Sequence, residues 1–174
     1  VTAPAEQISS GTYYLLADYQ VLALPKHAAE YRHTAATALN ERGVDALANI
    51  EIVFDPGFQK LKLHTLAVTR DGHRTDQLGR ATIRVLQRES ALEHAVIDGR
   101  KSAHIVLNDI RPGDTVEYAY SLTGTNPALG EAVSGSLPLQ FNMPVGRIAV
   151  RLLRPEGIPL QVRTRNTALA ATER

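Results

Sequence analysis

The stretch LNDIRPGDTVEYAYSLTGTNP, residues 107–127, decides the fold. Pro112 and Gly113 suit the two central positions of a type II turn, because Pro presets its own φ and Gly accepts a positive φ. After the turn, apolar and polar side chains alternate over residues 115–122. A period of two predicts a half-buried β-strand, and the stretch before the turn supplies a partner strand. We therefore expect a β-hairpin here.

The same alternation recurs in segments 60–65, 102–108 and 147–152, separated by short Gly, Pro, Asn and Asp clusters. Many short strands with regular turn signals are typical of a sandwich or barrel. We predict an all-β fold, a two-layer antiparallel β-sandwich with little helix. The expected hairpin turns are Asp71-Gly72, Asp98-Gly99 and Pro112-Gly113.

Two segments are ambiguous between helix and strand. Residues 26–42 are rich in Ala, and Gly43 suits a helix end, yet residues 30–39 also alternate like a strand, which is the interpretation we favour. Residues 88–96 suit one helical turn.

The opening stretch also carries three carboxylates, Asp109, Asp114 and Glu117. On an extended strand Asp114 shares a face with Val116, at the solvent end of that face, whereas Glu117 points to the opposite, exposed face. Asp114 and Glu117 are therefore not expected to converge like the acid pair of a glycosidase. Asp109 precedes the turn and suits hydrogen bonds to turn amides. The structural interpretation of the acids is favoured, and a hydrolase with a carboxylate cluster stays an alternative.

Composition excludes several classes of chemistry. The chain of 174 residues has no Cys, which excludes disulfides, thiolate metal sites and cysteine nucleophiles. Its six His show neither HxH nor HExxH spacing, and no GxSxG or phosphate-binding loop is present, so we expect no catalytic residue, no cofactor and no metal. There is no Trp, and of the Tyr residues only Tyr13, Tyr14 and Tyr19 are candidates for stacking on a sugar.

Charge is near balance overall but uneven along the chain. The net charge is +1, which gives no reason to expect nucleic acid as a partner, and no apolar run is long enough for a membrane span. Between residues 147 and 174 there are six Arg against two Glu. The candidate interaction surface for an acidic partner consists of Arg147, Arg151, Arg163 and Arg165.

Two blocks, residues 50–78 and 86–127, resemble a bacterial domain of unknown function. The similarity covers about residues 12–165 and rests on the order and spacing of short turn and strand motifs. Phe54, Asp55, Pro56, Gln59 and Tyr120 belong to the matching positions. The family-like scaffold motif comprises Asp71, Gly72, Asp98, Gly99, Arg111, Gly113, Asp114, Glu117 and Tyr118.

The resemblance implies an all-β sandwich that stands N-terminal to a transglutaminase-like domain of the papain-like cysteine type, in an exported, periplasmic protein. The chain opens with Val1, so we expect a processed or excised part of something longer. The expected division is a flexible segment 1–11, an accessory domain 12–165 and the start of a linker at 166–174.

The expected function is that of a non-catalytic accessory domain. It docks or positions the downstream transglutaminase-like domain or its substrate. The alternative, besides the hydrolase, is an extracytoplasmic module that binds protein, peptidoglycan or another glycan.

Overall fold

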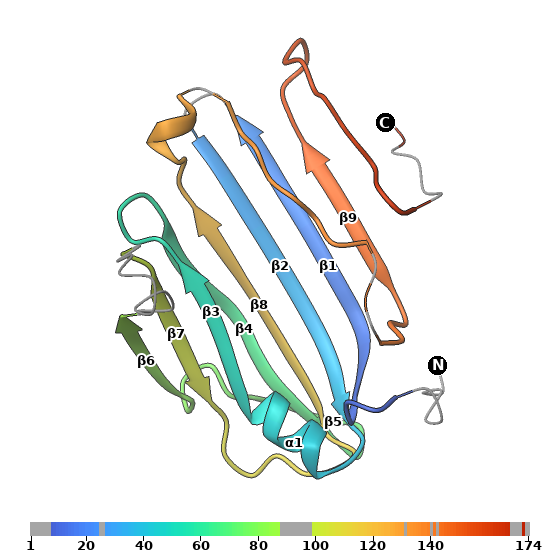
Figure 1. Ribbon diagram of the computed structural model, residues 1–174. Coiled ribbons are helices and arrows are strands. Elements are labelled where there is room, and N and C mark those ends of the chain that lie inside the picture. Colours follow the sequence, from blue (N-terminus) through green and yellow to red (C-terminus); the bar gives the residue numbers. More distant parts are fainter. Residues whose placement is uncertain are drawn as a thin grey trace, which may run out of the picture.

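The computed structural model describes residues 8–24, 27–87, 99–130, 132–139, 141, 143–167 and 172, and it confirms the all-β sandwich (Figure 1). Within these described ranges the regular elements are nine strands, one α-helix and a short 3₁₀ helix at Pro127–Leu129. The elements are β1 (Thr12–Leu24), β2 (His27–Ala38), α1 (Glu41–Ala48), β3 (Asn49–Phe54), β4 (Lys60–Arg70), β5 (His73–Asp76), β6 (Thr82–Gln87), β7 (Lys101–Val106), β8 (Thr115–Thr123) and β9 (Ile148–Leu153). No helix of the described residues is long and apolar enough to cross a membrane.

The strands form two layers of unequal width. A six-stranded sheet has the order β5-β4-β8-β2-β1-β9, and a three-stranded sheet has the order β3-β7-β6. Neighbouring strands are antiparallel except β1 and β9, which run parallel. Because β8 runs in the same direction as β1, it also runs in the same direction as β9. The chain between β8 and β9 must therefore return along the sheet, and it is long enough to do so.

The expected hairpin at Pro112-Gly113 is wrong, although the turn itself has the expected shape. Gly113 has φ +94° and the Arg111 carbonyl accepts from the Asp114 N–H at 3.0 Å, as in a type II turn. However, β7 lies in the small sheet and β8 in the large one. The segment between them crosses from one layer to the other and buries Leu107 and Ile110 on the way. Alternation reports which side of a strand is apolar but not which strand lies beside it.

Of the other two predicted hairpin turns, one is confirmed and one lies partly outside the described residues. The hairpin at Asp71-Gly72 is confirmed: it joins β4 to β5, and both turn residues have positive φ, 50° and 79°. Gly99 also has a positive φ of 69°, but Asp98 and the ambiguous residues 88–96 lie outside the described part of the chain.

Residues 30–38 are a strand, as expected, within β2, whereas the helix α1 that follows was not predicted. Asn40 is its N-cap, and the Asn40 side chain accepts from the Gly43 N–H at 3.2 Å. Gly43 therefore stands in the first turn of a helix and does not end one. It is buried, and a Cβ there would lie 1.9 Å from the Gly11 carbonyl oxygen, so only Gly fits.

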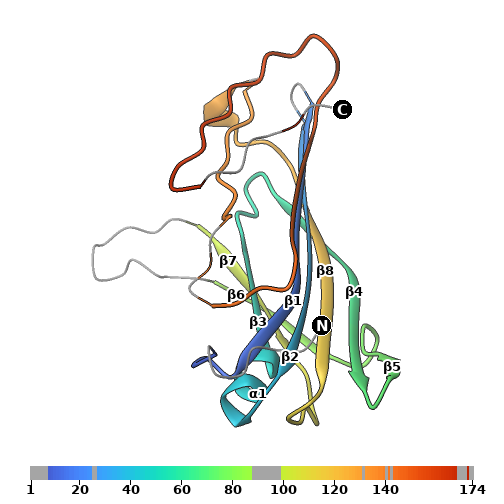
Figure 2. The same ribbon diagram turned by 90° about the vertical axis from the view of Figure 1, so that its right-hand side faces the viewer.

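The core lies between the small sheet and one half of the large sheet. Its buried members come from β2, β3, β4, β7, β8, α1 and the crossing segment; Leu66, Ile105 and Val116 are at most 1% exposed. No residue of β1 or β9 belongs to this buried cluster. Figures 1 and 2 show that the small sheet lies over the β4–β8 side, whereas the chain between β8 and β9 crosses the same face in front of β2 and β1.

Candidate functional site

A guanidinium–carboxylate pair closes one end of the core. Arg70 ends the inward-facing row of β4 after Val68, and Asp114 precedes Val116 in the inward-facing row of β8. Arg70 Nε donates to Asp114 Oδ1 at 2.8 Å, and Arg70 Nη2 donates to Asp114 Oδ2 at 2.7 Å. Asp114 is only 1% exposed, so the expected solvent end of the strand is in fact sealed by this bidentate pair.

Asp109 and Arg111 extend the pair toward the surface. Arg70 Nη1 donates to Asp109 Oδ2 at 3.1 Å, and Arg111 Nη2 lies 2.8 Å from Asp109 Oδ1. The backbone N–H of Arg111 donates to Asp114 Oδ2 at 2.9 Å. The turn amide is thus bound by Asp114, not by Asp109 as the sequence suggested. We call Arg70, Asp109, Arg111 and Asp114 the arginine cluster.

The cluster favours the charged forms of Arg70, Asp109 and Asp114. The hydrogen bond from Arg70 holds the pKa of Asp114 below its ordinary value, although burial opposes this. Hydrogen bonds from Arg111 and then Arg70 lower the pKa of Asp109, and those of Asp114 and Asp109 raise the pKa of Arg70. Carboxylates held ionised in this way suit structural pairing more than proton donation at neutral pH.

Glu117 lies apart from the arginine cluster, on the outer face of the large sheet. Glu117 Oε1 is 2.8 Å from His33 Nε2, and Arg74 Nε donates to Glu117 Oε2 at 3.0 Å. Burial raises the pKa of Glu117, but the hydrogen bonds from Arg74 and His33 lower it overall. The side chain is 27% exposed, so it is less open than the sequence suggested. The three acids therefore do not form one site.

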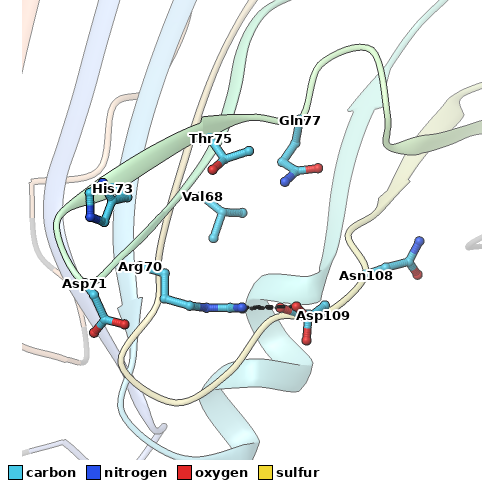
Figure 3. A pocket seen from close by; sticks show the side chains of 8 residues that line it. All are labelled: Val68, Arg70, Asp71, His73, Thr75, Gln77, Asn108 and Asp109. Atoms are coloured by element: carbon cyan, nitrogen blue, oxygen red, sulfur yellow. Dashed lines mark hydrogen bonds and ion pairs between the residues drawn. The ribbon is translucent and has the colours of Figure 1, made fainter.

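A cleft of about 440 Å³ opens beside the arginine cluster (Figure 3). It lies between the β4–β5 hairpin and the segment that crosses between the layers. The lining residues are Val68, Arg70, Asp71, His73, Thr75, Gln77, Asn108 and Asp109. No local sequence pattern predicts this cleft, because its two walls are distant along the chain. Among the described residues, no group of three or more His, Asp or Glu side chains suits a metal ion.

The tyrosines proposed for sugar stacking are not open platforms. Tyr13 is buried at 4% exposure, and Tyr14 and Tyr19 are half-buried. Tyr118 of the scaffold motif is half-buried and stacks on Tyr120 with ring centroids 6.4 Å apart. Burial raises the pKa of Tyr118 to about 12. Tyr14, Tyr118 and Tyr120 pack against the buried core cluster.

A family model for the domain of unknown function DUF3857, a family with a solved structure, matches residues 26–174. The chain belongs to this family. No curated protein matches the DUF3857 chain.

One solved structure shares the fold of the DUF3857 chain. The chain resembles the crystal structure of a "putative protease" from Parabacteroides distasonis, with a TM-score of 0.70 and 20% identity over 87% of this chain. The chain spans only 30% of that protein's length, so the likeness shows a shared fold and does not assign that protein's activity to this chain. A second match is the crystal structure of an M1 zinc metallopeptidase from Deinococcus radiodurans, at 16% identity over 66% of this chain and 21% of that protein's chain. Its TM-score of 0.30 is too low to indicate a shared fold.

The DUF3857 chain carries its candidate arginine surface along and beside the edge strand β9. All four residues of that surface, Arg147, Arg151, Arg163 and Arg165, are exposed. The inward-facing side of β9 is more surprising, because Ile148 and Val150 are 38% and 43% exposed. Sequence reasoning missed this open apolar face, since it assigns burial to whichever side of a strand is apolar.

Proposed function

We propose that this chain is a non-catalytic accessory domain of an extracytoplasmic protein, and that it docks against and positions a downstream transglutaminase-like domain or its substrate. The observation that carries the proposal is the unequal width of the two layers. The small sheet does not reach the β9 edge of the large sheet, where the inward-facing Ile148 and Val150 stay 38% and 43% exposed.

The uncovered face has the composition of an interface centre. The strand register places Val150 of β9 beside Tyr19 of β1 and Tyr19 beside Arg32 of β2. The Arg32 guanidinium lies 5.1 Å from the centre of the Tyr19 ring. Tyr and Arg next to exposed aliphatic side chains are enriched at the centres of protein interfaces. We call Tyr19, Arg32, Ile148 and Val150 the open face.

Charge supports an acidic partner beside the open face. Arg147 and Arg151 lie on the opposite side of β9 from Ile148 and Val150, and Arg151 is in register with Gln20. A partner that wraps around the β9 edge would meet apolar side chains on one side and guanidinium groups on the other. Such charges at the rim of an interface speed association and make it depend on salt.

The comparison with the P. distasonis structure supports the idea of one part in a larger protein. The present chain corresponds to 30% of that protein, whose description names a protease. Activity in such a protein then falls to other segments, and this domain contributes binding and position.

The first test is whether the full-length protein that contains these residues also carries a transglutaminase-like domain. A polypeptide with no transglutaminase-like domain would refute the proposal. If the domain is present, it is expressed apart from residues 1–174 and the two are mixed. We expect saturable binding, measured by calorimetry, that weakens as salt rises from 50 to 500 mM because exposed charges are screened.

Matched variants separate docking through the open face from a general effect of charge. Val150→Asp places a carboxylate in the open face, whereas Val85→Asp places one on the edge strand β6, where Val85 is 54% exposed. We expect Val150→Asp to weaken binding at least tenfold and Val85→Asp to leave it unchanged. Equal effects of the two variants, or none from either, would contradict docking at β9.

The non-catalytic part of the proposal has its own assay. Residues 1–174 alone are expected to turn over no peptide, amide or glycoside substrate. Turnover by the purified domain that disappears on substitution of Asp109, Asp114 or Glu117 would favour the hydrolase alternative instead.

A further inference from the structure

The cleft beside the arginine cluster has features that the docking proposal does not use. Five of its lining side chains are polar and have no hydrogen-bond or ion-pair partner among the described residues: Asp71, His73, Thr75, Gln77 and Asn108. Figure 3 shows them arranged around Val68, on the hairpin side and on the crossing segment. Their hydrogen-bonding capacity is open to a ligand, and a cleft of about 440 Å³ has the size of a small-ligand site.

The cleft has a rigid wall. The bond of Arg70 to Asp114 and the bonds of Asp109 to Arg70 and Arg111 fix the wall, because Arg70, Asp109 and Asp114 each have more than one partner. Val68, which is 7% exposed, gives the lining one apolar side chain. A pre-organised wall lowers the entropy lost when a ligand binds.

Charge indicates the kind of group that the cleft accepts. Arg70 balances Asp114, and Arg111 balances Asp109. Asp71 has no partner and leaves one net negative charge at the rim, where it borders both this cleft and a smaller hollow of about 220 Å³. A cationic group on the ligand would pair with Asp71, and its alkyl stem would lie against Val68.

The surroundings favour a polypeptide over other cations. Gln77 and Asn108 each offer a carboxamide, which donates and accepts and so matches a peptide group. The cleft also adjoins β5, which is the edge strand of the large sheet, and a peptide chain can hydrogen-bond to such an edge. We propose that this cleft binds a polypeptide segment through a lysine or arginine side chain that pairs with Asp71. The inference is independent of the docking proposal.

The test is a titration of the chain with the peptide acetyl-Gly-Val-Lys-Val-Gly-amide, followed by amide NMR shifts. We expect saturable shifts at His73, Thr75, Gln77 and Asn108. The same peptide with norleucine in place of lysine keeps the alkyl stem and loses the charge. It is expected to bind about fivefold more weakly or worse.

A conservative variant tests the pairing group. Asp71 has φ 50°, a region that Asn tolerates well, so Asp71→Asn removes the charge without straining the turn. We expect it to reduce lysine-peptide affinity to that of the norleucine peptide. Glu156→Gln, in an exposed turn near the C-terminal end, is the control for net charge and should bind like the wild type.

Each other outcome overturns the inference. No saturable shift at millimolar peptide would show that the cleft is not a peptide site. Equal binding of the two peptides, or an unchanged affinity in Asp71→Asn, would show that the charge of Asp71 is not recognised. If Glu156→Gln lowered the lysine-peptide affinity as much as Asp71→Asn, the effect would come from the net charge of the domain and not from pairing with Asp71.

Discussion

The two edges of the large sheet differ in which side chains are buried and which are exposed. At the β5 end, charged side chains enter the core, and each finds partners: Asp114 is 1% exposed and receives hydrogen bonds from Arg70 and the Arg111 amide. At the β9 end, apolar side chains lie outside the core, and Ile148 and Val150 are 38% and 43% exposed. At the first end the buried charges are satisfied within the domain, whereas at the second the small sheet does not reach the edge strand β9.

The difference assigns the two edges different roles: one stabilises the domain, and the other is available for association. A satisfied buried charge holds the fold together, because removing either partner leaves the other unpaired in a low dielectric. An exposed apolar patch adds little to the stability of the domain, since its area stays in water, but it provides the driving force for association. Substitutions at the two ends should therefore give opposite results in measurements of unfolding and of binding.

The largest expected effect is at the β5 end. Arg70→Ala leaves the buried Asp114 carboxylate without its guanidinium partner, and this should lower the free energy of unfolding more than any other substitution below. Urea denaturation followed by far-UV circular dichroism measures the loss.

A second variant identifies the cause of that loss. Asp114→Asn in the Arg70→Ala background removes the unpaired charge and should recover part of the stability, because the two residues are coupled. A loss in Arg70→Ala alone that is no larger than the loss in Glu117→Gln would show that the cluster is not structural.

The turn before β8 comes next. Gly113 has φ +94°, and a Cβ there would meet no atom within 4 Å, so any cost of a side chain comes from backbone strain alone. Gly113→Val should destabilise by roughly 1–3 kcal/mol. Gly79→Ala is the matched control, because a Cβ there also meets nothing and no positive φ is involved. Similar losses in both variants would remove the role assigned to the turn.

How far the sequence predicted these features depends on the distance that each feature spans. Turn chemistry is local, so the positive φ of Gly113 and the Asp71-Gly72 hairpin followed from adjacent residues. The pairing of Arg70 with Asp114 joins positions 44 residues apart, and no periodicity encodes it. The parallel edge strand β9 and its open apolar face are properties of the sheet order, which alternation along one strand does not contain.

Acid should weaken the β5 end selectively. The pKa values of Asp109, Asp114 and Glu117 are lowered in the fold, so the unfolded chain binds protons first as the pH falls. Their contribution is fully present above the unfolded value of about 4 and is lost as the pH falls through the lower folded values. The urea midpoint should stay flat from pH 7 to about 5 and then drop. Asp114→Asn should flatten the drop, and an unchanged acid profile in that variant would count against the pairing.

A smaller effect is expected on the outer face. Glu117→Gln keeps the shape of the side chain but weakens two charge-assisted hydrogen bonds, from Arg74 and with His33. The sequence placed Glu117 on an exposed face, where the loss would be about 0.5 kcal/mol or less. With 27% exposure and two partners, we now expect roughly 1 kcal/mol, again measured by urea denaturation. A value within error of zero would restore the exposed interpretation.

The smallest effect on stability should come from the open face, and it sharpens the contrast between the two ends. Val150→Thr keeps the branched shape that suits a strand and replaces one methyl with a hydroxyl at a side chain already 43% exposed. The free energy of unfolding of the isolated domain should change by no more than about 0.5 kcal/mol, as for most surface substitutions. Val68→Thr makes the same change in the same sheet where the side chain is 7% exposed, and should cost at least about 1 kcal/mol because the hydroxyl is buried. If Val150→Thr costs as much as Val68→Thr, then β9 is part of the core of the domain, and the open face is not available for docking.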